Sequence, residues 1–165
     1  MALEASAFDA LYRELAPRVR AYLRQLVTSY AVAEDLTQEI FTQFWLRPDG
    51  FDVARGSLSS YLFGMARHMA GRWRDARNTD VEVEERATAE DWERNRAVAD
   101  AMARLPEEQR SLLWLREVEG QSYDELALIL GIPVGTVRSR LFAARMALRK
   151  IWLGAERNGE MYGVR

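Results

Sequence analysis

The fold is decided near the C-terminal end, where residues 122–150 read SYDELALILGIPVGTVRSRLFAARMALRK. Ser122 followed three residues later by Glu125 is a capping box, which predicts the start of a helix, and Gly131 predicts its end. Pro133 then predicts the first turn of a second helix, because proline is favoured at that position. A short capped helix, a tight turn and a longer helix form the helix-turn-helix pattern.

The second helix of this pattern runs from about Pro133 to Lys150 and has one apolar and one basic face. Its apolar positions follow steps of three and four residues: Val137, Leu141, Ala144, Leu148 and Trp152. No acidic residue occurs between positions 126 and 155. The alternative is that the arginines only keep the outer face of a bundle helix in water. It is less favoured, because the capping box, the glycine turn and the proline at the start of a new helix occur together.

The first part of this helix would enter the major groove of DNA. We expect Arg138 and Ser139 to reach base edges and Phe142 to contact a thymine methyl group. Three further arginines are candidates for phosphate contacts: Arg140, Arg145 and Arg149.

Charge is distributed unevenly along the 165 residues, which carry a net charge of -2 and have a sequence pI of about 5.6. Residues 1–78 have 10 basic and 9 acidic side chains, residues 79–98 have 3 and 7, and residues 99–165 have 10 and 9. A protein that binds DNA strongly on its own is usually basic. Any affinity for DNA must therefore come from basic residues that are concentrated on one part of the surface.

Several classes of function have little support in the composition. The chain has no cysteine and a single histidine, His68, so disulfides, Cys/His zinc sites and most nucleophilic catalysis are excluded. We expect no enzyme activity, no cofactor and no metal. There is no signal-peptide pattern and no run of 18 apolar residues, so we expect a cytoplasmic protein without membrane insertion.

The N-terminal half predicts three amphipathic helices. The first carries apolar residues at helical spacing over 8–26 and is expected to bend at Pro17, and the second spans about 32–46. The third begins after Gly56-Ser57 and becomes basic toward its end. No segment predicts a strand.

Residues 79–98 are acidic, and the stretch 79–96 shows no sustained apolar face, which indicates a linker. The fold class is therefore all-α, with small helical domains over 1–78 and 99–165 and a flexible acidic linker between them. The alternative is a surface helix of one continuous bundle. Fully extended, the 18 residues 79–96 would span roughly 60 Å, which is close to 18 base pairs of duplex.

The sequence resembles bacterial RNA polymerase sigma factors of the compact extracytoplasmic-function (ECF) group. The C-terminal domain of that group is similar to LPEEQRSLLWLREVEGQSYDELALILGIPVGTVRSRLFAARMALRK, residues 105–150. Its N-terminal domain is similar to AEDLTQEIFTQFW, residues 33–45, and ARGSLSSYLFGMARHMAGRWRDARN, residues 54–78.

The resemblance implies a promoter-specificity subunit that binds core RNA polymerase and recognises the minus-35 and minus-10 elements. The C-terminal domain would bind the upstream element as duplex, and the N-terminal domain would hold the melted downstream element. A polar helix face would dock on the clamp helices of the largest polymerase subunit: Asp35, Gln38, Glu39 and Thr42. Without the resemblance, we would interpret this face as solvated.

Downstream recognition would fall on Asp52–Gly56 and on residues 61–78. The resemblance and the interleaving of aromatic and basic groups select Tyr61, Arg67, His68, Arg72, Trp73, Arg74 and Arg77. Trp73 also lies at core spacing, and His68 and Ala143 depart from the residues common in the group. The resemblance further implies an anti-sigma factor as a partner.

Two other functions remain as alternatives. An autonomous helix-turn-helix repressor or activator would bind DNA without polymerase, usually at a palindrome because such proteins dimerise. An enzyme acting on nucleic acid would need metal ligands from Asp35, Glu39, Asp49 and Asp52, which form no recognisable pattern.

Overall fold

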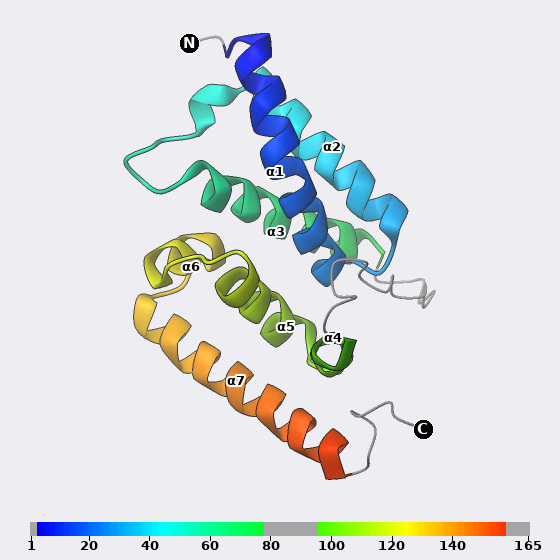
Figure 1. Ribbon diagram of the computed structural model, residues 1–165. Helices are drawn as coiled ribbons and strands as arrows, with labels where there is room; N and C mark the ends of the chain where they lie inside the picture. The colour runs from blue at the N-terminus through cyan, green and yellow to red at the C-terminus, as the bar shows by residue number, and fades with distance from the viewer. Residues whose placement is uncertain (1–2, 78–95, 158–165) are drawn as a thin grey trace.

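A computed structural model of the chain describes residues 3–77 and 96–157 (Figure 1). Every regular element in these two ranges is a helix, and the described residues contain no strand. The predicted all-α class is therefore confirmed. Most of the predicted linker, residues 79–98, lies outside the described residues, but its last residues begin a helix at Arg96.

The N-terminal half consists of α1 (Ala5–Leu26), α2 (Tyr30–Leu46) and α3 (Leu58–Ala76), with a short 3₁₀ turn, η1 (Pro48–Gly50), after α2. The helix α1 continues through Pro17 and packs against both other helices. Ser29 and Ser57 cap α2 and α3, since each side chain accepts a hydrogen bond from a backbone N–H three residues later. Aromatic and aliphatic side chains fill the core between them, including Tyr22, Phe41 and Phe63.

The C-terminal half contains α4 (Arg96–Ala103), α5 (Glu107–Leu113), a π-helical turn η3 (Trp114–Val118), α6 (Tyr123–Leu130) and α7 (Val134–Arg157). Three details differ from the sequence prediction. The helix α4 was not expected, α7 begins at Val134 and not at Pro133, and α7 continues beyond Lys150. Gly131 has a φ of 64°, which fits its predicted helix-ending role, and Gly120, shortly after η3, has a φ of 67°.

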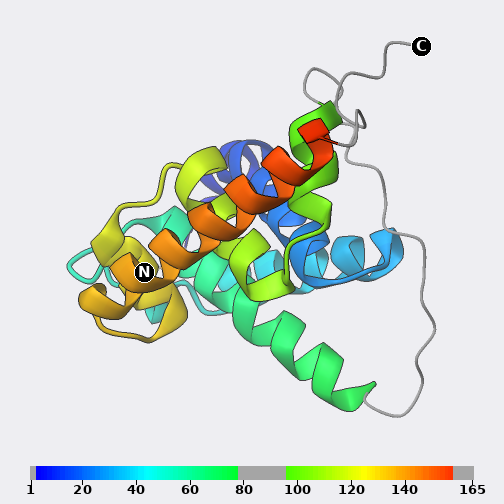
Figure 2. The same ribbon diagram turned by 90° about the horizontal axis from the view of Figure 1, so that it is seen from below.

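The two halves pack against each other (Figures 1 and 2). The helices α1 and α3 of the first half contact α5 and α6 of the second, and one hydrophobic core runs through both. Arg110 of α5 is buried at this boundary and donates hydrogen bonds to the backbone oxygens of Gln25, at 2.9 Å, and Leu105, at 3.1 Å. The sequence did not indicate this packing, because the partners lie on opposite sides of the predicted linker.

No single described helix is both long enough and apolar enough to cross a membrane. They are met only when α6 and most of α7 are counted as one segment, and that pair is bent by 97°.

Candidate nucleic-acid interface

The helices α6 and α7 form the predicted helix-turn-helix. At the start of α6, the Ser122 hydroxyl accepts a hydrogen bond from the Glu125 backbone N–H at 3.1 Å. The Glu125 carboxylate accepts one from the Ser122 N–H at 3.0 Å, so the capping box is complete. Gly131 ends α6 in the left-handed conformation, and α7 begins at Val134. The cap and the glycine thus fix the sharp turn that presents α7 on the surface.

The helix α7 buries one face and exposes the other, as its sequence pattern predicts. Val137, Leu141 and Ala144 are completely buried. All six side chains predicted to contact the upstream element are exposed: Arg138, Ser139, Arg140, Phe142, Arg145 and Arg149. Phe142 is 68% exposed on this face, and Met146, one turn further along α7, is 48% exposed.

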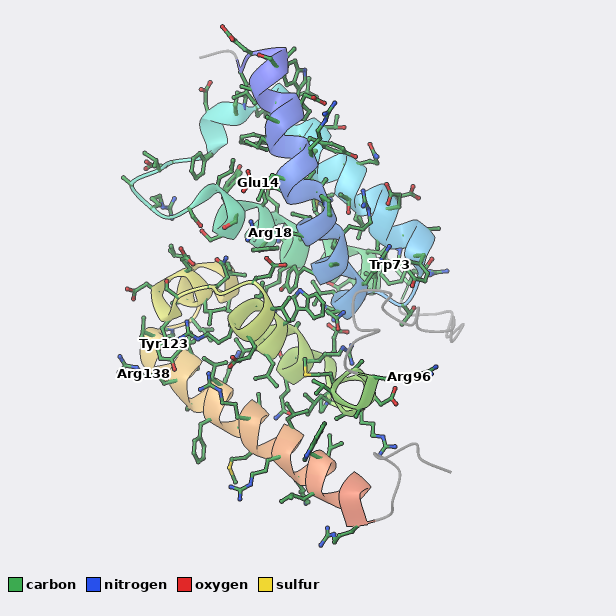
Figure 3. All side chains as sticks on the ribbon, in the orientation of Figure 1. Glu14, Arg18, Trp73, Arg96, Tyr123 and Arg138 are labelled. Atoms are coloured by element: carbon green, nitrogen blue, oxygen red, sulfur yellow. The ribbon has the colours of Figure 1, made fainter. Side chains whose placement is uncertain are left out.

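Within this face, the six side chains have different surroundings. Arg145 donates a hydrogen bond to the Glu117 carboxylate at 2.8 Å, and this bond raises the pKa of the Arg145 guanidinium. The Arg138 guanidinium lies 6.0 Å from the ring centre of Tyr123, and Figure 3 shows both residues where α6 and α7 meet. Arg138 is therefore loosely held, whereas Arg145 already has an acidic partner.

A groove of about 790 Å³ lies along α3 and is closed on its other side by the end of α6. Five of the seven predicted downstream-element residues line it: Tyr61, Arg67, His68, Arg72 and Arg74. The other two do not. Trp73 packs partly against the core, and Arg77 lies 4.9 Å above the Trp73 ring.

Small residues form part of the groove wall, and the sequence analysis did not identify them as site residues. Gly64 and Gly71 are seven residues apart on α3, which places them on one face, and a Cβ atom at either position would have no neighbour within 4 Å. This space beside Arg67 and His68 could receive a flat base. The seven-residue spacing of the two glycines was the signal that could have revealed it.

The groove also lies at the boundary between the two halves. Leu128, Ile129, Leu130 and Gly131 of the helix-turn-helix line it opposite α3. Arg74 forms an ion pair with Glu107 at the start of α5. A residue predicted to hold DNA is therefore engaged by an acidic side chain of the same chain.

The third predicted surface lies on α2. Asp35, Gln38, Glu39 and Thr42 are all exposed there. The Gln38 amide donates a hydrogen bond to the Tyr12 hydroxyl of α1 at 3.1 Å. The helix α2 contains Glu34, Asp35 and Glu39 but no lysine or arginine. This surface is acidic, in contrast to the outer faces of α3 and α7.

No group of His, Asp or Glu side chains in the two described ranges is arranged to hold a metal ion. The four acidic residues considered as metal ligands of an enzyme acting on nucleic acid therefore form no such group: Asp35, Glu39, Asp49 and Asp52.

Comparison with known proteins shows to which family both halves of the chain belong. Residues 11–79 match the family model described as Sigma-70 region 2, and residues 95–148 match Sigma-70, region 4. The chain is 34% identical over 160 residues to the ECF RNA polymerase sigma factor SigL of Mycobacterium tuberculosis, covering 90% of each protein. It is 33% identical over 170 residues to the RNA polymerase sigma-H factor of Pseudomonas aeruginosa, covering 87% of this chain and 85% of that protein.

Two solved structures share the fold. The sigma factor RpoE of Bartonella quintana, solved in complex with the anti-sigma factor NepR, has a TM-score of 0.71 and 27% identity over 89% of this chain and 97% of that one. CnrH, solved with the cytosolic domain of CnrY, has a TM-score of 0.68 and 24% identity over 90% of this chain and 88% of that one.

The chain belongs to the ECF family of RNA polymerase sigma factors. It is a promoter-recognition subunit of RNA polymerase. Sigma factors as a class recognise promoters and perform no catalysis themselves.

Proposed function

We propose that the chain divides promoter recognition between its two halves. Residues 99–165 bind the upstream, minus-35 element as duplex, and residues 79–98 link them to residues 1–78, which hold the melted minus-10 element and dock on core polymerase. This assignment predicts a cytoplasmic, non-enzymatic protein that needs neither metal nor cofactor. The observation that carries it is the separation of two basic surfaces, on α7 and α3, from one acidic surface on α2.

The two basic surfaces suit different forms of DNA. The face of α7 is convex and presents Arg138, Ser139 and Phe142 from the first turns of a recognition helix, which fits the major groove. The groove face of α3 combines Tyr61 with arginines and two glycines. Aromatic stacking and cationic backbone contacts are typical of single-strand binding, so α3 is the better site for a melted strand.

Promoter binding requires the two halves to separate. The end of α6 walls the groove on α3, and Glu107 is paired with Arg74 at the groove. A DNA strand entering this groove would displace both. Two elements separated by nearly two helical turns also could not be reached while α3 and α6 are in contact. The packed arrangement is therefore the resting form, and binding to polymerase favours the open one.

An anti-sigma factor would be the partner that keeps the chain inactive. The related RpoE was solved with the anti-sigma factor NepR. An anti-sigma factor could act here by stabilising the packed arrangement or by covering the acidic face of α2.

The docking assignment is tested by charge reversal on α2. Asp35→Arg combined with Glu39→Arg changes two exposed carboxylates and should abolish binding to core polymerase while leaving thermal unfolding unchanged. The matched control is Glu14→Arg with Asp124→Arg, which reverses two exposed acidic residues elsewhere. If the α2 variant binds polymerase as tightly as the parent chain, this docking assignment is wrong.

A further inference from the structure

A second cavity, of about 490 Å³, lies between the N-terminal part of α1 and the C-terminal part of α2. Four of its eight lining residues are aromatic: Phe8, Tyr12, Phe41 and Trp45. The Phe8 and Trp45 rings meet edge to face at 4.8 Å, and Tyr12 meets Phe41 in the same way at 5.0 Å. We call these residues the aromatic groove.

The aromatic groove is open to solvent, unlike the core beneath it. Phe41 is only 2% exposed, but Trp45 is 40% exposed and the neighbouring Leu46 is 70% exposed. Exposed apolar surface of this kind marks an interaction site, and aromatic anchors dominate the binding energy of many interfaces.

The aromatic groove is continuous with the predicted docking face of α2. Gln38 and Thr42 belong to that face and also line the groove. Gln38 is fixed to the groove wall by its hydrogen bond to the Tyr12 hydroxyl at 3.1 Å. A partner that covers the polar face of α2 would therefore also reach Phe8 and Trp45.

The charge beside the groove indicates the chemistry of its occupant. The helix α2 carries three acidic residues and no basic one, and Asp35 and Glu39 are exposed. A cavity of this size accepts one or two large apolar side chains, as when a helix lays its apolar face into a groove. The complementary partner is a helix with a bulky apolar residue flanked by lysine or arginine.

We propose that the aromatic groove receives an apolar side chain from a basic helix of the largest polymerase subunit. This inference rests on the proposed docking of α2 and extends that interface to the start of α1. Phe8 precedes residues 11–79, the stretch that matches Sigma-70 region 2, so only part of the α1 wall of the groove, including Tyr12, lies within that stretch. Phe8 and Trp45 are then affinity-determining residues, and Asp35 and Glu39 supply the charge.

The test measures binding of the full chain to core polymerase without DNA. Phe8→Ser and Trp45→Ser are each expected to weaken binding at least tenfold. Leu153→Ser, at an apolar residue of α7 that is 44% exposed and lies outside the groove, should leave it unchanged. If Asp35→Arg with Glu39→Arg abolishes binding but both groove variants bind normally, the docking proposal stands and the groove proposal is wrong. If none of these variants weakens binding, both are wrong.

A second measurement uses a variant whose folding is confirmed by its activity. A photo-crosslinking amino acid at position 45, in a variant that still supports transcription, should crosslink to the largest polymerase subunit in the assembled holoenzyme. Crosslinking to another subunit or to a second copy of this chain would overturn the proposal. So would a crosslink yield no higher than that from the same probe at position 153.

Discussion

Arg18 of α1 and Glu119, just after η3, form an ion pair across the boundary between the two halves, with 2.8 Å between Nε and Oε2. The Glu119 side chain is only 6% exposed, and the Arg18 guanidinium also lies 5.8 Å from the centre of the Phe63 ring. Figure 3 shows Arg18 on the side of α1 that faces the second half. A charged residue of each half is thus held where separation would return it to water.

Removing this ion pair should weaken the packed arrangement. Glu119→Gln and Arg18→Gln should each lower the free energy of unfolding, and a double-mutant cycle should give a coupling on the order of 1 kcal/mol, since Arg18 is partly screened by solvent. Urea unfolding of the parent chain, the two single variants and the double variant measures this coupling. Strictly additive effects would mean that the pair does not join the two halves.

The pair of Glu107 with Arg74 leads to a separate prediction about DNA. Glu107→Gln should release Arg74 and raise the affinity of the free protein for single-stranded downstream-element DNA severalfold, because a guanidinium becomes available to a phosphate. Glu108→Gln is the matched control, since this neighbouring acid is exposed. Fluorescence anisotropy with a labelled strand measures both. Equal affinities for the two variants would exclude a role of Glu107 in blocking the groove.

Substitutions in the recognition helix should have different effects at residues that contact bases and at residues that contact phosphates. Arg138→Ala should reduce transcription from a promoter with an intact upstream element by about 10- to 100-fold, the effect of losing one good base contact. Arg149→Ala should instead weaken binding about equally on intact and altered elements and lower the salt dependence. Run-off transcription from one promoter with the intact upstream element and one with an altered element measures both variants. If Arg138→Ala has the same effect on both templates, Arg138 does not read the sequence.

Tyr22 makes the folded chain sensitive to alkaline pH. Burial raises the pKa of the Tyr22 phenol from 10.0 to about 12, although the nearby Arg67 and Arg74 lower it in part. Above pH 10 the unfolded chain loses this proton first, so stability that is fully present below pH 10 declines as the pH approaches 12.

The corresponding variant is Tyr22→Phe, which removes the proton and retains the ring. At about 1.4 kcal/mol per pKa unit, the difference between parent and variant should change by roughly 2–3 kcal/mol between pH 9 and 12 in favour of the variant. Urea unfolding over this range measures it. A difference that does not vary with pH would show that Tyr22 titrates normally in the folded state.

Local signals predicted the helices and the exposed faces well. The capping box at Ser122, the positive φ at Gly131 and the apolar spacing of α7 each depend on neighbouring residues, and all have the expected structural role. The same spacing rules could not separate Phe8 and Tyr12 from ordinary core positions. Their openness depends on where α2 ends and leaves Trp45 partly uncovered.

Long-range pairs could not be predicted from the sequence. Arg18 and Glu119 are 101 positions apart and lie on opposite sides of the predicted linker. No local sequence pattern around either residue indicates the other as its partner. For the same reason, the sequence showed α3 as a free basic surface and did not show that the end of α6 covers part of it.

The central claim, two-element promoter recognition that depends on polymerase, is tested most directly by transcription with purified components. Core polymerase from the source bacterium is combined with this chain on a library of genomic fragments, and the transcript starts are mapped by sequencing. We predict starts downstream of two unlike elements at fixed spacing, absent without the chain and lost with Asp35→Arg combined with Glu39→Arg. Absence of promoter-dependent transcripts, together with tight, specific binding of the chain alone to palindromic sites, would contradict the account.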